Sequence, residues 1–213
     1  LVNSLGFPNV GLTIASQRLA KYQSSSWLTP MIASISGVTV DEISACVTKL
    51  DSLVDALELN ISSPNTAGLR AFQQTENLED LLSTINSIKT KPLFVKLPRL
   101  FQSDQENFFA LLDVCLKSNI DGIVLANTLP IQDEKLFVGQ GGLSGNPLLD
   151  ETLEMVSSVR KTIGAKTAII ASGGISSGQN VIDMICAGAN AVQVYTGFVY
   201  GGPSFVKQAN QEL

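Results

Sequence analysis

The sequence predicts an α/β fold, a (β/α)8 TIM barrel of which about six of the eight βα units lie within residues 1–213. Three observations lead to this prediction: short apolar runs recur along the chain, longer amphipathic segments separate them, and most of the apolar runs end in glycine or small polar residues. Apolar runs without polar alternation are typical of parallel strands that are buried on both faces. An open parallel sheet concentrates its site at one switch point, whereas a barrel gathers the ends of all its strands around one mouth. Polar residues at nearly every strand end therefore favour the barrel.

The expected strands and helices alternate along the chain. After an opening loop over residues 1–12, six apolar runs are expected to form strands: Met31–Ser36, Ala56–Ile61, Leu93–Leu97, Gly122–Ala126, Ala168–Ala171 and Ala191–Val194. Apolar residues at three- and four-residue spacing predict the helices between them: Val40–Leu50, Leu78–Ile88, Asn107–Lys117, Leu148–Ile163 and Asn180–Ala187. Thr39 followed by Asp41 and Glu42 is typical of a helix start, because the threonine caps free N–H groups and the carboxylates oppose the helix dipole.

No low-complexity linker and no shift in composition interrupts the chain, so we expect a single barrel domain over residues 1–213. A complete barrel typically needs about 250 residues and eight strands. We therefore expect about two βα units to be missing and the chain to be an N-terminally truncated form of a longer protein.

The composition argues against several classes of function. Acidic residues outnumber basic ones by 19 to 14 and no run of Lys or Arg occurs, so nucleic-acid binding is not expected. Histidine is absent, which removes the commonest general base, and no metal site is expected. The three cysteines, Cys46, Cys115 and Cys186, lie far apart in expected helices, and scattered buried thiols suit a reducing compartment. Because no segment approaches the ~20 apolar residues of a membrane span, we expect a cytoplasmic location.

The stretch 55–70 is the strongest candidate for a catalytic loop. An apolar run there ends in Asn60, Ser62, Ser63 and Asn65, and Pro64 forces the chain out of regular structure. A polar turn that closes a strand is the simpler interpretation of such a cluster. The same kinds of residue follow the other expected strands, at Ser34 and Ser36, Lys96, Asn127 and Thr128, Gly173 and Gly174, and Tyr195 and Thr196. This repetition favours the catalytic loop, because the carboxyl ends of barrel strands meet at one mouth.

Glycine follows the last two expected strands directly. In barrels, the loops after the seventh and eighth strands often bind phosphate through backbone N–H groups, and Gly173, Gly174 and Gly197 would permit a close approach. The alternative is that these glycines serve tight turns between strand and helix. Two such loops in succession favour a ligand that carries phosphate.

Lys96 interrupts an apolar run, where a lysine is costly unless it meets a carboxylate or faces a ligand. Its own strand carries no acidic residue, which favours the ligand. Amides at Asn3, Asn60, Asn65 and Asn127 both donate and accept hydrogen bonds, so they suit a small heterocycle with C=O and N–H edges. Residues 141–145 (GGLSG) are expected to form a flexible loop, whose glycines could also let the backbone approach a flat ring.

Several segments resemble those of the dihydroorotate dehydrogenase family and occur in that family's order along almost the whole chain. They are residues 3–9 (NSLGFPN), 58–65 (ELNISSPN), 95–97 (VKL), 126–128 (ANT), 141–145 (GGLSG), 173–175 (GGI) and 194–198 (VYTGF). The resemblance implies an FMN-containing (β/α)8 barrel that oxidises dihydroorotate to orotate in pyrimidine (UMP) biosynthesis.

The resemblance also implies roles for single residues. Ser63 matches the catalytic base that removes the substrate C5 proton while hydride passes from C6 to the flavin N5. The positions that hold the pyrimidine match Asn3, Gly6, Phe7, Asn60, Asn65, Asn127 and Thr128. The positions that hold the flavin match Asn60, Lys96, Ala126, Gly145, Gly173, Gly174, Tyr195 and Thr196. Of these, Gly174, Tyr195 and Thr196 would lie near the flavin phosphate.

The resemblance leaves the class within the family open. Serine at the base position is similar to the quinone-dependent, membrane-associated class, whereas residues 35–39 (ISGVT) look closer to the soluble class. The electron acceptor (a quinone or fumarate), peripheral membrane attachment and homo-oligomerisation therefore stay open. The family's first two strands, with a lysine that contacts flavin and orotate, have no counterpart in residues 1–213. Two alternatives remain: a phosphate-binding barrel enzyme without redox chemistry that uses Lys96, and a non-catalytic barrel remnant that needs a partner.

Overall fold

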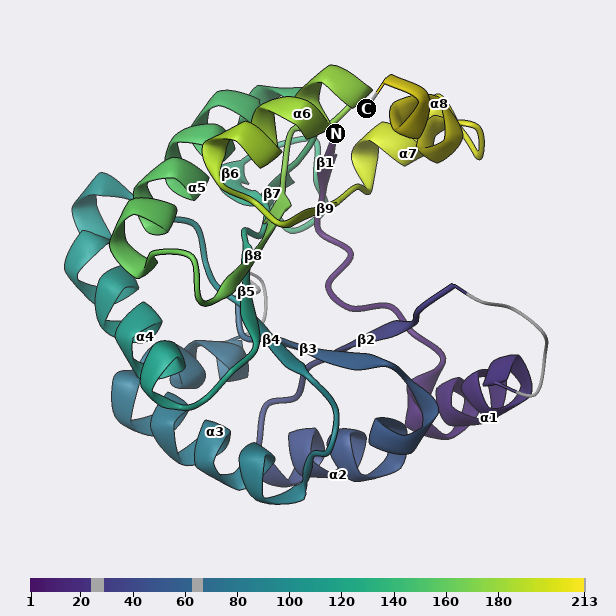
Figure 1. The fold of residues 1–213 in the computed structure, drawn as a ribbon, viewed down its shortest axis with the longest axis vertical. Coiled ribbons are helices and arrows are strands. Elements are labelled where there is room, and N and C mark those ends of the chain that lie inside the picture. Colours follow the sequence, from purple (N-terminus) through teal and green to yellow (C-terminus); the bar gives the residue numbers. More distant parts are fainter. Residues whose placement is uncertain (24–28, 63–66, 213) are drawn as a thin grey trace. The chain divides into compact units, whose positions relative to one another are not determined.

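The computed structural model describes residues 1–23, 29–62 and 67–212. Its backbone contacts divide the chain into two compact units (Figure 1). The N-terminal unit comprises Leu5–Lys96 and Phe109–Asp121, and the C-terminal unit comprises Leu1–Ser4, Leu97–Phe108 and Gly122–Leu213. The prediction of a single domain stays a prediction.

The N-terminal unit is built on three parallel strands in the order β2-β3-β4. They are β2 (Ile32–Ile35), β3 (Ala56–Asn60) and β4 (Leu93–Lys96). The helices of this unit are α1 (Gly11–Gln23), α2 (Val40–Leu50), α3 (Thr75–Ile88) and the second half of α4 (Gln105–Lys117), with short 3₁₀ turns at Asp51–Leu53 and Ala67–Gln73. In Figure 1, α2 and α3 lie side by side along one face of these strands.

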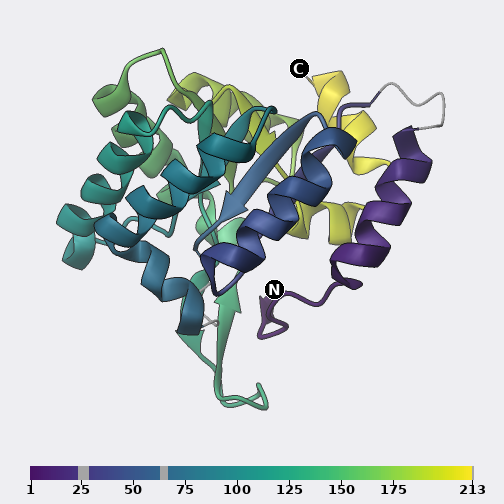
Figure 2. The same ribbon diagram turned by 90° about the horizontal axis from the view of Figure 1, so that it is seen from below.

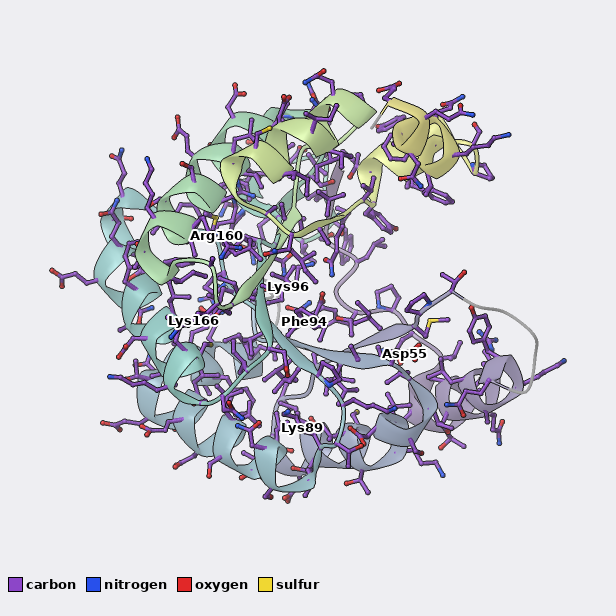
Figure 3. The ribbon with its side chains drawn as sticks, in the orientation of Figure 1. Asp55, Lys89, Phe94, Lys96, Arg160 and Lys166 are labelled. Carbon is purple, nitrogen blue, oxygen red and sulfur yellow. The ribbon has the colours of Figure 1, made fainter. Side chains whose placement is uncertain are left out.

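Side chains alternate between the two faces of these strands, and this alternation creates a polar face. The fully buried leucines of β3 and β4, Leu57, Leu59 and Leu93, belong to the face that the apolar stripes of α2 and α3 cover. Glu58 and Lys96 occupy the alternate positions and belong to the opposite face. Figure 3 labels Lys96 together with Phe94, two residues before it on the same face of β4.

Asp51 joins the end of α2 to the turn that precedes β4. The residue is 7% exposed, and its Oδ1 accepts hydrogen bonds from the backbone N–H groups of Thr90 (2.9 Å) and Lys91 (3.0 Å), while its Oδ2 accepts from the Thr90 hydroxyl. Burial by itself would raise the pKa of Asp51, but the hydrogen bonds from Thr90 and Lys91 outweigh it and lower the pKa. Asp51 therefore secures the start of the strand that carries Lys96.

The C-terminal unit contains three parallel strands in the order β5-β8-β9 and a small antiparallel sheet in the order β1-β7-β6. The parallel strands are β5 (Gly122–Leu125), β8 (Ala168–Ser172) and β9 (Ala191–Gln193). The antiparallel strands are β1 (Val2–Asn3), β6 (Leu129–Gln132) and β7 (Gln140–Leu143). The helices are α5 (Leu149–Ile163), α6 (Gly178–Ala187), α7 (Thr196–Gly201) and α8 (Phe205–Glu212), with 3₁₀ turns at Gln102–Asp104 and Asn146–Leu148. Figure 2 shows the β6–β7 hairpin extending away from the parallel strands of this unit.

Arg160 ties together the amino-terminal ends of β8 and β9. Its guanidinium donates to the carbonyl of Gly188 (2.8 Å), the carbonyl of Thr167 (3.0 Å), the Oδ1 of Asn190 (2.6 Å) and the carbonyl of Gly164. Figure 3 labels Arg160 on α5. A single side chain thus satisfies several carbonyl groups that follow α5 and α6, which fixes the spacing of the loops at this end.

The predicted parallel strands and the helices between them are confirmed, and α2 has the predicted bounds. Three details of the prediction were wrong. The opening segment is not all loop, because β1 pairs with β7 and α1 begins at Gly11. Residues 141–145 are not a flexible loop, because residues 141–143 belong to β7, where a Cβ at Gly142 would lie 2.1 Å from the Thr128 hydroxyl. Cys186 is exposed rather than buried, whereas burial raises the pKa of Cys115 to about 12.

Candidate active site

Asn60 and Lys96 lie opposite each other where β3 and β4 end. Their Cα atoms are register partners in the N-terminal unit. Asn60 is 8% exposed, and its Oδ1 accepts hydrogen bonds from the N–H (3.1 Å) and the hydroxyl (2.7 Å) of Ser62. These two bonds set which end of the amide faces Ser62, so the Asn60 NH₂ group points to the other side.

Glu58 is a member of this site that the sequence interpretation missed. It is 4% exposed and accepts a hydrogen bond from the Ser34 hydroxyl (2.8 Å) on β2. Burial lowers the pKa of Lys96, and the Glu58 carboxylate partly offsets this by raising it. The sequence prediction considered only the strand of Lys96 itself and so missed this carboxylate on β3; that Lys96 faces a ligand stays a prediction. The signal was present in the charged residue of the otherwise apolar run 56–59, one position before the predicted Asn60.

The other predicted site residues of the N-terminal unit are Gly6, Phe7, Ser63 and Asn65. Gly6 (φ +69°) and Phe7 lie in the exposed segment before α1, where the Phe7 carbonyl accepts a hydrogen bond from the Asn9 side chain (2.8 Å). Ser63 and Asn65 lie outside the described residues, so their roles stay predictions.

The segment after β5 carries Ala126, Asn127 and Thr128 in the C-terminal unit. The Ala126 N–H donates to the Ser172 carbonyl (2.9 Å), which extends the pairing of β5 with β8 by one residue. The Asn127 Oδ1 accepts a hydrogen bond from the Thr128 N–H (2.7 Å). Asn3, also predicted for the pyrimidine, lies in β1 opposite Gly142 of β7. Ala126, Asn127 and Thr128 therefore lie in the segment that joins β5 to β6, and Asn3 lies in a strand of the small antiparallel sheet.

A cavity of about 410 Å³ in the C-terminal unit contains part of the predicted phosphate site. Its lining residues are Leu1, Ser144, Gly145, Asn146, Pro147, Ser176, Thr196, Gly197, Tyr200 and Gly201. The Thr196 hydroxyl donates to the Ser144 hydroxyl (2.9 Å). At Gly145 (φ +88°) a Cβ atom would lie 2.8 Å from Thr196 Cγ2, so only glycine leaves this wall open. The Ser144 hydroxyl in turn donates to the Leu1 carbonyl (3.2 Å), so both hydroxyl protons are used within the protein and the cavity offers space beside the Gly145 backbone.

The remaining predicted phosphate residues do not line this cavity. Gly174 (φ +85°) abuts the start of α5, where a Cβ would lie 2.4 Å from the Leu149 backbone nitrogen. Gly173 (φ +135°) lies against the Thr152 hydroxyl, because a Cβ at position 173 would be 2.9 Å from the hydroxyl oxygen of Thr152. Both glycines therefore pack against α5, and the phosphate role of Gly173 and Gly174 stays a prediction. Tyr195 is 69% exposed. Conversely, Ser144 and Ser176 line the cavity but were not among the predicted site residues, although each lies close to a glycine motif in the sequence.

The family model for dihydroorotate dehydrogenase matches residues 1–213. The chain belongs to the dihydroorotate dehydrogenase family. It is 34% identical to the dihydroorotate dehydrogenase (quinone) of Sulfurimonas denitrificans, over 99% of this chain and 61% of that protein. It is 32% identical to that of Corynebacterium efficiens, over 100% of this chain and 59% of the relative. The chain therefore spans about three-fifths of the length of these relatives.

Solved structures of this family share the fold. The crystal structure of the Eimeria tenella dihydroorotate dehydrogenase in complex with ferulenol has a TM-score of 0.86 and 30% sequence identity, over 99% of this chain and 65% of that one. The ligand-free form from the same organism has a TM-score of 0.85, also at 30% identity. The predicted fold class, an α/β barrel of which this chain holds a part, is confirmed.

Within residues 1–23, 29–62 and 67–212, no three cysteine, aspartate or glutamate side chains gather in a way that could hold a metal ion. No helix in the part of the chain that the structure describes is both long enough and apolar enough to cross a bilayer.

Proposed function

We propose that this protein oxidises dihydroorotate to orotate with FMN, in the biosynthesis of pyrimidine nucleotides. The observation that carries the proposal is the match of the dihydroorotate dehydrogenase family model to residues 1–213. The relatives named as quinone-dependent enzymes support a quinone as the electron acceptor. Serine in the motif at residues 58–65, rather than cysteine, supports the same class.

Dehydrogenation removes a proton from C5 and a hydride from C6 of the substrate. We assign the proton to the hydroxyl of Ser63. Serine has an intrinsic pKa far above neutral, so this hydroxyl needs a polarising neighbour such as Thr66, or a chain of water molecules to solvent. When bound, FMN supplies the hydride acceptor, its N5 atom.

The pyrimidine ring is assigned to Asn3, Gly6, Phe7, Asn60, Asn65, Asn127 and Thr128. The contacts of Asn60 support this assignment, because Ser62 occupies its amide oxygen and thereby orients the NH₂ group as a donor. Amides are suited to this task because orotate presents both carbonyl and N–H groups along its ring. A donor fixed in advance also reduces the entropy that binding costs.

The flavin is assigned to Asn60, Lys96, Ala126, Gly145, Gly173, Gly174, Tyr195 and Thr196. The residues present fit such a group. Lys96 is a largely buried cation with Glu58 as its carboxylate neighbour, and it can complement negative charge on a flavin ring. Gly145 and Thr196 line one cavity of the C-terminal unit, where the absence of a side chain at Gly145 leaves room for a phosphate.

Anaerobic mixing tests the reaction directly. Purified protein that contains residues 1–213 should carry flavin, and dihydroorotate should bleach the oxidised flavin absorbance. Ser63→Ala should slow this bleaching by orders of magnitude while orotate binding changes little, because the hydroxyl acts on the proton and not on ring affinity. A protein that stays colourless with added FMN, or a Ser63→Ala variant that turns over at the wild-type rate, would refute the proposal.

One observation favours a second candidate function. Burial lowers the pKa of Lys96, which is the property of lysines that form imines with carbonyl substrates. A phosphate-binding enzyme without redox chemistry would then form a covalent adduct that borohydride traps on Lys96. The absence of FMN-dependent stabilisation in thermal unfolding would point instead to a non-catalytic remnant, because a ligand that binds only the folded state must raise the melting temperature.

A further inference from the structure

Arg99 is a buried charge that the proposed function does not use. It lies in the segment 97–108 of the C-terminal unit, and only 2% of its side chain is exposed. Burial lowers the pKa of the guanidinium, and the nearby Glu151 carboxylate offsets part of this effect. A buried cation costs several kcal/mol unless its donors are satisfied. The buried guanidinium of Arg99 therefore needs hydrogen-bond acceptors for its several N–H groups.

The guanidinium reaches two structural elements at once. Nη1 donates to the backbone carbonyl of Asn127 (3.2 Å), and Nη2 donates to Glu151 Oε2 (3.3 Å) and to the hydroxyl oxygen of Thr152 (3.3 Å). Thr152 is fully buried and donates its own proton to the Leu148 carbonyl (2.7 Å), so its oxygen is oriented as an acceptor for Arg99. Arg99 thus links the segment after β5 to the first turn of α5.

The turn after β8 packs against the same group. A Cβ atom built on Gly173 would lie 2.9 Å from the Thr152 hydroxyl and 3.5 Å from Arg99 Nη1. The glycine therefore lets the backbone after β8 lie directly on the Arg99–Thr152 pair. The segment after β5 and the turn after β8 consequently both pack against the buried Arg99 side chain.

The contact with Asn127 fixes a peptide group that the proposed function assigns to the pyrimidine. The Asn127 carbonyl is held by Arg99, and its side-chain Oδ1 accepts from the Thr128 N–H (2.7 Å). With both oxygens of Asn127 engaged, the direction of its NH₂ group is determined. The lysine ammonium is a compact charge that lacks the planar fork, so it would not reach Asn127, Glu151 and Thr152 with the same geometry.

We propose that Arg99 is a positioning residue, which holds the Asn127 carbonyl against α5 and so determines how the Asn127 side-chain NH₂ group faces the pyrimidine ring. This inference rests on the proposed function. Arg99 does not touch the substrate, and its effect on binding is transmitted through Asn127.

A double-mutant cycle on orotate affinity tests this inference. We expect Arg99→Lys to raise the dissociation constant of orotate, measured by calorimetry, about tenfold, because one misplaced hydrogen-bond partner in a site is worth about 1.4 kcal/mol. Asn127→Ala should raise it as well, and Arg99→Lys should add almost nothing in the Asn127→Ala background. In stopped-flow measurements, Arg99→Lys should raise the substrate concentration for half-maximal flavin reduction, with little change in the rate at saturation. Arg18→Lys, an exposed arginine on α1, is the matched control and should change none of these quantities.

A second variant covers the case in which Arg99→Lys does not fold. Glu151→Gln keeps an oxygen acceptor for Nη2 on a side chain that is 58% exposed, and it should weaken orotate binding in the same direction by about two- to threefold. Equal effects of Arg99→Lys with and without Asn127 would overturn the inference, as would a loss of stability with unchanged orotate affinity in every variant. Failure of the wild-type protein to bind orotate would instead refute the proposed function itself, and this inference with it.

Discussion

Replacement of Asp51 should destabilise the protein by an amount that depends on which oxygen is lost. In Asp51→Ala, the N–H groups of Thr90 and Lys91 and the Thr90 hydroxyl all lose their acceptor. Hydrogen bonds to a charged group contribute about 1.5–3 kcal/mol each. The three share one carboxylate that solvent partly screens, so we expect a loss of about 3 kcal/mol in the free energy of unfolding. Asp51→Asn should cost only about 1 kcal/mol, because its Oδ1 can still accept from both backbone N–H groups.

The pH dependence separates the charge from the hydrogen bonds. The pKa of Asp51 is lowered in the folded protein, since burial, which would raise it, is outweighed by the hydrogen bonds from Thr90 and Lys91. The contribution of the charge is therefore complete above the unfolded pKa of about 3.9 and is lost as the pH falls through the lower folded pKa. The difference in the free energy of unfolding between wild type and Asp51→Asn should be largest at neutral pH and should shrink below about pH 4.

Urea unfolding followed by circular dichroism, at several pH values, measures both effects. Asp80→Asn on the exposed face of α3 is the matched control, and we expect it to change the free energy of unfolding by less than about 0.5 kcal/mol. A wild-type stability in Asp51→Ala, or a pH-independent difference for Asp51→Asn, would refute the reasoning.

Two further predictions concern the C-terminal unit. Gly145→Ala should weaken FMN binding at least about tenfold in a fluorescence titration while riboflavin, which lacks the phosphate, binds as before, because the new Cβ would displace Thr196 at the cavity wall. Gly139→Ala has a similar φ of +70° with no atom within 4 Å of the new Cβ, so it controls for backbone strain, and equal FMN affinities in the two variants would contradict the prediction. Arg160→Met should lower the free energy of unfolding by about 2–4 kcal/mol, because four oxygen acceptors lose their donor. Lys161→Met on the exposed side of α5 should leave the urea midpoint nearly unchanged, and a similar midpoint for both variants would count against this role of Arg160.

Local patterns in the sequence were sufficient to predict those helices and strands that are specified by residues close together in the chain. The helix Val40–Leu50 was predicted with its bounds, and its cap is as expected, since the Thr39 hydroxyl accepts a hydrogen bond from the Glu42 N–H (3.2 Å). The apolar runs were sufficient for the parallel strands. The same pattern indicated which polar side chains follow the strands at their carboxyl ends, because parallel strands share one direction.

Contacts between segments far apart in the sequence were not predictable in this way. β1 and β7 pair across about 140 residues, so nothing near Val2 or Gly142 signals a strand. Glu58 meets Lys96 only because β3 and β4 are adjacent and in register. Arg99 follows the predicted strand without any local feature that explains its charge, and its partners come from the segment after β5 and from α5.

The sequence by itself determined the class of fold, the order of its βα units and the family to which the chain belongs, because periodicity and short motifs are properties of neighbouring residues. Only the tertiary structure decided which of the strand-end residues have partners and of what kind. It placed a carboxylate beside Lys96, a hydroxyl pair and a cavity beside Gly145, and the start of α5 against Gly173 and Gly174. The physical reason is that burial and hydrogen bonding depend on strand register and on helix packing, which bring together residues that the chain keeps apart.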